Sequence, residues 1–187
     1  MKKLFVSVVL CVLSIVSMAQ TKTVSSIESF KFDAREVTVV NNRKRVKEYR
    51  VAAKLPDLIR KEITFPEENK GEVYIYKKDK KIVYLPLFEQ SYEENLDNEE
   101  NYIIKVIKDL KEREQADPVF KEDFYAGRIK EISYENGLKI KFDKLDRISG
   151  YYFPVKIRVY DVDALISEVV IKNVQVNLPL GKEEFEI

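Results

Sequence analysis

The sequence predicts a mainly β protein of the α+β class, in which a curved antiparallel sheet forms an incomplete barrel and one or two helices cover its concave apolar face. Three observations support this fold class. Apolar and polar residues alternate in much of the chain, one amphipathic segment breaks that alternation, and only five glycines occur in 187 residues. Because glycine inside strands marks bulges and sharp bends, its scarcity indicates a continuous sheet.

Alternation with a period of two residues identifies the strands. In the segment 59–65, Ile59, Ile63 and Phe65 share one face, and charged or polar residues occupy the other. The same pattern recurs in three further segments, 138–143, 153–160 and 174–178. One apolar and one polar face is typical of strands in antiparallel sheets. We therefore expect about nine strands, arranged mostly as sequential hairpins.

Turn-forming residues lie between the expected strands. Asn136-Gly137 is a pair favoured in tight hairpins, and it is followed by an alternating segment. Residues 77–81 are expected to turn the segment 73–76 back onto 82–85. These turns favour an antiparallel sheet whose strands follow chain order.

The segment 97–114 departs from strand periodicity and predicts an amphipathic helix. Its apolar residues follow the i, i+3, i+4, i+7 spacing of one helix face, and they are Ile103, Val106, Ile107 and Leu110. Asp97 is expected to be the N-cap, with Glu100 completing a capping box, and Asp117-Pro118 to end the helix. A second, shorter helix or turn is expected at 119–125. Since one helix covers a broad sheet incompletely, we expect an apolar cavity or groove to remain.

The first nineteen residues predict a cleavable signal peptide. Lys2 and Lys3 precede the apolar run 4–16, and Ser17-Met18-Ala19 offers small residues at the −3 and −1 positions of a cleavage site. The run is shorter than the roughly 20 apolar residues of a membrane span, so an uncleaved anchor is the lesser alternative. We expect an exported protein, soluble in the periplasm, with a single domain at 20–187.

The composition excludes several kinds of site. The chain has no histidine, and its one cysteine, Cys11, lies in the predicted signal peptide without the small preceding residue that lipid attachment needs. Without these residues there is no Ser-His or Cys-His machinery and no thiolate metal site, so we expect no enzyme activity, metal or cofactor. The formal net charge of +1 indicates neither a nucleic-acid partner nor an anionic membrane face.

Two charged runs allow more than one interpretation. The acidic run consists of Glu93, Glu94, Asp97, Glu99 and Glu100. Its spacing differs from that of an EF-hand loop, so a solvated loop is expected rather than a calcium site. The basic run consists of Arg43, Lys44, Arg45 and Lys47. It could contact phospholipid headgroups or an acidic partner, but a plain surface turn is the expectation.

The run Lys54-Leu55-Pro56-Asp57-Leu58-Ile59-Arg60-Lys61-Glu62-Ile63 resembles the strand-turn-strand of the outer-membrane lipoprotein carrier (LolA-like) family. Further segments similar to that family are 70–73, 81–86, 152–157 with Asp161, and 170–177 with Phe185. The resemblance covers residues 54–185. It implies a half-barrel, lidded by helices, that encloses an apolar cavity. Family members carry the acyl chains of lipoproteins between two membranes.

Two departures from the family pattern concern the transfer cycle. Residues 25–29 allow only a short helix where the best-known carriers have a long one. Leu55 stands where those carriers have an arginine before the turn proline, which is important for releasing cargo, and Arg60 lies near but not at the matching position. The resemblance therefore carries over the fold better than the release mechanism.

The predicted function is a non-catalytic periplasmic carrier or chaperone for acyl chains of lipoproteins or a related lipid. The implied partners are an inner-membrane releasing complex and an outer-membrane acceptor, and we expect a monomer. If every apolar strand face points inward, the cavity is lined by Ile59, Ile63, Phe65, Val73, Ile75, Leu85, Ile103, Val106, Ile107, Leu110, Ile140, Phe142, Ile157 and Val159. The alternatives are an envelope sensor or assembly module with a filled cavity and, more distantly, a hydrolase using Glu62 and Asp143.

Overall fold

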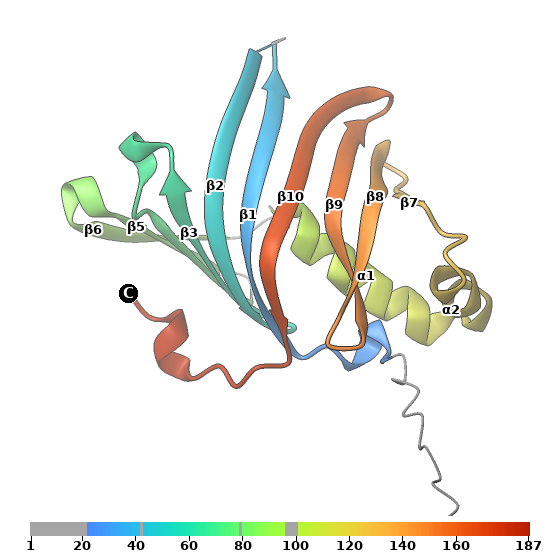
Figure 1. The fold of residues 1–187 in the computed structure, drawn as a ribbon. Helices are drawn as coiled ribbons and strands as arrows, with labels where there is room; N and C mark the ends of the chain where they lie inside the picture. The colour runs from blue at the N-terminus through green and yellow to red at the C-terminus, as the bar shows by residue number, and fades with distance from the viewer. Residues whose placement is uncertain (1–21, 42, 79, 96–100) are drawn as a thin grey trace, which may run out of the picture.

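Antiparallel strands in one unclosed sheet dominate the computed structural model, which describes residues 22–41, 43–78, 80–95 and 101–187 (Figure 1). The predicted signal peptide and its cleavage site lie outside the described residues. The strands are β1 (Ser29–Val40), β2 (Arg43–Lys54), β3 (Leu58–Phe65), β4 (Val73–Lys77), β5 (Lys80–Leu85), β6 (Gln90–Asn95), β7 (Glu131–Ser133), β8 (Leu138–Ile148), β9 (Tyr151–Asp161) and β10 (Ala164–Val176). The helices are α1 (Tyr102–Ala116) and α2 (Pro118–Tyr125).

The strand order is β6-β5-β4-β3-β2-β1-β10-β9-β8-β7, so neighbours in sequence are mostly neighbours in the sheet. The exception is the pairing of β1 with β10, which joins an N-terminal half to a C-terminal half. Among the residues that the structure describes, β6 and β7 form the two edges and do not pair, which leaves the barrel incomplete. The predicted fold class is confirmed, with ten strands in the described part of the chain where about nine were expected.

The hairpin between β7 and β8 contains the predicted Asn136-Gly137 turn. Gly137 has φ +85°, a left-handed conformation that glycine adopts without steric cost. The Gly137 amide donates to the Tyr134 carbonyl at 3.1 Å, and the Tyr134 amide donates to the Leu138 carbonyl at 2.9 Å. The turn therefore sets the register of β7 against β8.

The ends of α1 differ in part from the prediction. The N-cap is Asn101, whose Oδ1 accepts from the amides of Ile103 at 3.1 Å and Ile104 at 3.2 Å. The expected cap Asp97 and capping-box Glu100 lie outside the described residues. Asp117 ends α1 as predicted and also caps α2, accepting from the Val119 and Phe120 amides at 2.9 and 3.1 Å. The second helix, expected from residue 119, begins at Pro118.

The sheet packs on both of its faces. Figure 1 shows α1 lying across the face of β8, β9 and β10, with α2 beyond it. The main apolar core lies between these helices and the concave face. The C-terminal tail, which includes the short 3-10 helix η4 (Lys182–Phe185), covers part of the opposite face through Leu180 and Phe185. The short helix expected at 25–29 is the 3-10 turn η1 (Val24–Ser26).

Candidate functional site

Three phenylalanines from β1 and β9 lie in the concave-face core. Phe30 and Phe153 meet edge to face at 5.5 Å between ring centroids, and Phe30 stacks on Phe32 at 5.9 Å. Phe32 and Phe153 complete the cluster at 6.5 Å. The strand pairing places alternate residues of β1 on this face, with Lys31 and Asp33 on the other. The rings are buried in the main core and give the concave face a bulky apolar surface.

Helix α1 covers the concave face with its apolar stripe. The side chains of Ile103, Val106 and Ile107 are fully buried, and so is Ile104, which the spacing argument did not include. Their spacing brings them to one side of the helix, and Leu110 continues the row one turn later. α1 therefore has the position of a lid whose apolar face is part of the core.

The structure gathers ten of the fourteen predicted lining residues into this one core. They are Ile59, Ile63, Ile103, Val106, Ile107, Leu110, Ile140, Phe142, Ile157 and Val159. Phe30, Phe32, Phe153 and Tyr49 belong to the same core but were not predicted as lining residues. The alternation of 153–160 had already placed Phe153 on an apolar strand face, so that signal was available in the sequence.

The other four predicted residues lie elsewhere. Val73 and Ile75 pack on the opposite face of the sheet with Leu180 and Phe185 of the C-terminal tail. The reason is that Tyr76, not its neighbours, faces the concave core. Phe65 is 43% exposed at the end of β3, beyond an irregularity in its pairing with β2. Leu85 is only partly buried where β5 gives way to the turn at Pro86.

The core side chains fill the space beneath α1. Ile103, Ile107, Ile140, Ile157 and Phe153 each have 0% of their surface exposed. Protein interiors are packed at the density of organic crystals, so the described residues of this core leave little space for a guest chain while α1 is in place. An acyl ligand could enter only if α1 moved away from the sheet.

A pocket of about 520 Å³ opens beside the lid, between α1 and the turn that follows β2. Leu55 and Pro56 give it an apolar wall, and Lys108 and Lys111 line it from α1. The Lys111 ammonium donates to the Ile27 carbonyl, and burial lowers the pKa of this lysine from its usual value. Leu55, which stands at the position of the arginine in the carriers that the sequence resembles, thus lines this pocket.

Buried polar contacts anchor the C-terminal half of α1. Glu114 accepts from the Ser25 amide at 2.6 Å and from the Tyr125 hydroxyl at 2.8 Å. The same hydroxyl accepts from the Val24 amide at 2.8 Å. This network joins α1 to η1 and α2, so both neighbours restrict any movement of the helix. Earlier in α1, Asp109 accepts from the Tyr134 hydroxyl.

Two partly buried tyrosines, Tyr125 and Tyr134, predict a loss of stability at alkaline pH. Burial, followed by the hydrogen bond to Glu114, raises the pKa of Tyr125 above its usual 10.0, and burial with Asp109 does the same for Tyr134. Above pH 10.0 the unfolded chain releases these protons while the folded chain retains them. The contribution of these two tyrosines to the free energy of unfolding is therefore complete below that pH. It is lost as the pH rises further.

Urea denaturation at about pH 9 and about pH 11 should show this fall. The fall should be smaller in Tyr125→Phe, which removes one of the late-titrating hydroxyls. Titration of tyrosinate absorbance provides a second measurement, because these two partly buried tyrosines should ionise after the exposed ones. An equal fall in both proteins would show that Tyr125 does not contribute.

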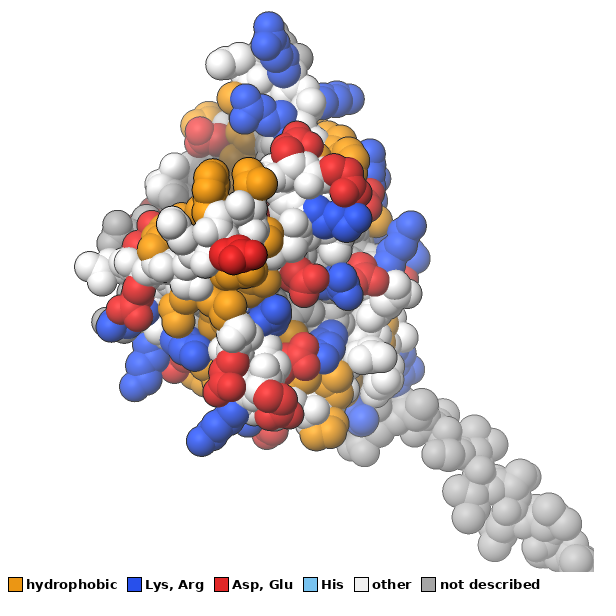
Figure 2. All heavy atoms as spheres, turned by 90° about the vertical axis from the view of Figure 1, so that its left-hand side faces the viewer, with side chains coloured by type: hydrophobic (Ala, Val, Ile, Leu, Met, Phe, Trp, Pro, Cys, Tyr) orange, Lys and Arg blue, Asp and Glu red, His pale blue; other side chains and the backbone are white. Residues whose placement is uncertain are grey.

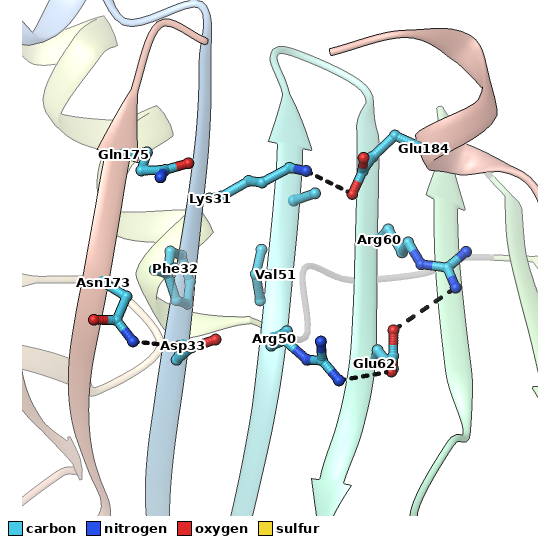
Figure 3. Close-up of a pocket in the computed structure, with 11 residues that line it drawn as sticks. Lys31, Phe32, Asp33, Arg50, Val51, Arg60, Glu62, Asn173, Gln175 and Glu184 are labelled. Carbon is cyan, nitrogen blue, oxygen red and sulfur yellow. Dashed lines mark hydrogen bonds and ion pairs between the residues drawn. The ribbon is translucent and has the colours of Figure 1, made fainter. Parts of the chain in front are cut away.

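A second pocket, of about 320 Å³, lies on the outer face of the sheet near the C-terminal tail (Figure 3). Lys31 pairs with Glu184 of the tail at 2.9 Å, and the Arg60 guanidinium donates to the Glu186 carbonyl at 2.6 Å. Glu62 lies between Arg50 at 3.2 Å and Arg60 at 3.8 Å. These contacts fasten the tail to β1 and β3, which indicates a structural role for the charges of this pocket.

The carboxylates considered for acid-base chemistry are separated in the sheet. Asp143 of β8 accepts from Arg158 at 2.6 to 2.9 Å, whereas Glu62 of β3 pairs with Arg50 and Arg60. Each carboxylate is thus bound by arginine on its own part of the sheet. Within the described ranges, no group of three or more acidic, histidine or cysteine side chains could hold a metal ion. The same residues include no helix long and apolar enough to cross a membrane.

The fold recurs in solved structures although no protein-family model and no curated protein matches the sequence. A LolA superfamily protein from Nitrosomonas europaea is 13% identical with a TM-score of 0.58, over 87% of this chain and 91% of that chain. A DUF1329 family protein from Desulfovibrio piger is 11% identical with a TM-score of 0.61, over 87% and 91%. A domain described as an outer membrane lipoprotein-sorting protein, from Vibrio parahaemolyticus, is 6% identical with a TM-score of 0.54, over 84% and 88%.

Proposed function

We propose, from the premise that this chain has the LolA-like fold, that it is a non-catalytic carrier for the acyl chains of lipoproteins or a related lipid. The observation that carries the proposal is the burial of the α1 stripe on the concave face of an unclosed sheet. When such a lid opens, the apolar concave face of the sheet loses its contacts with α1 and gains contacts with the ligand. The acyl chain would take the place of Ile103, Val106 and Ile107 against the phenylalanine cluster.

Apolar burial can supply the free energy for this exchange. Each buried CH₂ group contributes about 0.8 kcal/mol, so a long acyl chain gains several kcal/mol on leaving water. That gain offsets the contacts that α1 loses on the concave face. The polar anchors at Glu114 and Tyr125 would keep the far half of α1 attached, so the lid would swing rather than unfold.

The pocket beside α1 is the proposed entrance. Its volume of about 520 Å³ lies within the usual range of small-ligand pockets. Leu55 and Pro56 provide apolar surface for the chain, and the polar lining carries both signs of charge, from Lys108 and Lys111 and from Glu28, Asp57 and Glu112. A ligand with an apolar tail and a polar head matches this combination.

The proposal places the protein in the periplasm after removal of residues 1–19, where a carrier has to be free to diffuse. A carrier needs a donor and an acceptor, so an inner-membrane releasing complex and an outer-membrane acceptor are the proposed partners. The outer membrane lipoprotein-sorting description of the Vibrio parahaemolyticus domain supports this role by similarity of fold. Release has to proceed without an arginine before Pro56, because Leu55 occupies that position.

Lipid co-purification tests the proposal. Protein isolated gently from its native envelope should carry acyl species that are detected by mass spectrometry after organic extraction. A variant with an obstructed interior, Ile140→Trp, is the matched control if circular dichroism shows that it folds. Extracts without enriched acyl species in the unaltered protein would contradict the carrier function.

A second candidate function is favoured by the packed interior. With the core residues under α1 fully buried, the domain could act as an envelope sensor or assembly module that binds other proteins and no lipid. The same extraction separates the two functions, because the module would yield no bound acyl species. It would also keep its stability unchanged when fatty acids are added.

A further inference from the structure

The hairpin of β1 and β2 extends past its neighbours at one end of the sheet (Figure 1). Its two strands stay paired to the tip, where Val40 lies opposite Arg43 and Val39 opposite Lys44. Four cations occur within five residues of β2 at this end, namely Arg43, Lys44, Arg45 and Lys47. The net charge of the whole chain is only +1, and it therefore does not reveal the local concentration of positive charge at this hairpin.

The four cations have no acidic partner among the residues that the structure describes. The first ion pair below them joins Arg35 to Glu48 at 3.7 Å, and Arg50 further down pairs with Glu62. Glu36, opposite Lys47 in the register, instead accepts from the Ser167 hydroxyl at 2.9 Å. Most other cations of the sheet are paired with carboxylates, so an unpaired group at one tip stands out.

Valines accompany the cations at the tip. Val40 is 47% exposed, and Val39 and Val37 are only partly buried, with Val37 opposite Val46. Figure 2 shows Lys and Arg side chains gathered at the top of the molecule, where the hairpin ends. The tip therefore combines positive charge with small apolar side chains on a convex surface.

We propose that the β1–β2 tip docks on a phospholipid bilayer that contains anionic headgroups. Lys and Arg near such a surface are attracted to it, and Val39 and Val40 can bury their methyl groups at the boundary of the acyl region. A convex tip presents its charges outward, which fits a broad charged plane better than the side-chain pocket of a protein partner. Docking would hold the protein at a membrane while the concave face and α1 remain free.

Vesicle sedimentation tests this assignment with the full mature chain. Binding is expected to vesicles made of equal parts phosphatidylcholine and phosphatidylglycerol, and not to vesicles of phosphatidylcholine alone. Raising the salt should weaken binding, because the attraction is screened over a Debye length of about 8 Å at physiological ionic strength. Combining Arg43→Gln, Lys44→Gln, Arg45→Gln and Lys47→Gln should weaken it by at least on the order of 100-fold.

A matched variant controls for net charge. Lys54, Lys78, Lys130 and Lys182 are exposed and lie away from the tip, Lys54 at the opposite end of β2. Changing all four to glutamine removes the same charge and should leave vesicle binding within about two-fold of the unaltered protein. Because all eight side chains are exposed, both variants should retain the circular dichroism spectrum of the fold.

Two results would overturn the assignment. One is equal binding by the tip variant and the unaltered protein, which would place the membrane contact elsewhere. The other is no binding to any vesicle at low salt, which would leave an acidic protein as the partner of the tip. Neither result bears on acyl binding, since the tip variant should still bind a fluorescent fatty-acid probe in solution if the carrier function holds.

Discussion

Replacing Ile107 by alanine is expected to lower the free energy of unfolding by about 2–4 kcal/mol and to tighten the binding of a fluorescent fatty-acid probe. Ile107 lies at the centre of the α1 stripe and is fully buried on the concave face. Its truncation leaves a cavity and weakens the packing of the lid. Because the closed lid competes with an acyl chain for the same surface, an easier opening should raise the apparent affinity by about ten-fold or more.

Urea denaturation and a probe titration measure the two effects on the same variant. Val119→Ala is the control, since Val119 lies on α2 with 68% of its surface exposed and should change neither quantity appreciably. A filled-interior module would show the loss of stability without the gain in affinity. That combination would contradict the view that α1 is a lid over a lipid site.

Glu114→Leu is expected to lower the free energy of unfolding by about 3 kcal/mol. The Glu114 side chain is only 3% exposed, and it accepts hydrogen bonds from the Ser25 amide and the Tyr125 hydroxyl. Leucine fills a similar volume but leaves both partly buried donors without this acceptor. The loss should also loosen η1 and α2 from α1, which amide hydrogen exchange in 102–125 would report.

Two further variants sharpen this test. Glu114→Gln keeps one oxygen acceptor and should recover part of the lost stability. Glu122→Leu removes a carboxylate from an exposed ion pair with Arg128 and should cost at most about 1 kcal/mol. If Glu114→Leu and Glu122→Leu have the same small effect, Glu114 does not anchor the lid.

Local periodicity predicted most elements of the fold, because most of the strands and helix α1 bury one face whatever their partners. The alternation in 59–65 and 138–143 identified parts of β3 and β8, and the spacing of Ile103, Ile107 and Leu110 identified α1. The α1 N-cap is Asn101 rather than the predicted Asp97, and its side chain binds the amides of Ile103 and Ile104.

The periodicity of β4 does not indicate which of its two faces points to the concave core. The strand reads Val73-Tyr74-Ile75-Tyr76, so both of its faces are apolar enough to be buried. The tail residues Leu180 and Phe185, more than a hundred positions later, cover Val73 and Ile75 and leave the tyrosines to the core. The network of Glu114 with Ser25 was equally hidden, because its partners lie 89 residues apart and share no pattern.

Titration of the mature protein with a fluorescent fatty-acid probe tests the carrier function most directly. The account predicts saturable binding at a single site, a blue-shifted emission from an apolar environment, and loss of both signals in a folded Ile107→Asp variant. Competition by an unlabelled lipopeptide should displace the probe. No saturable binding by either the unaltered protein or the loosened Ile107→Ala variant, with both shown to be folded, would contradict the proposed function.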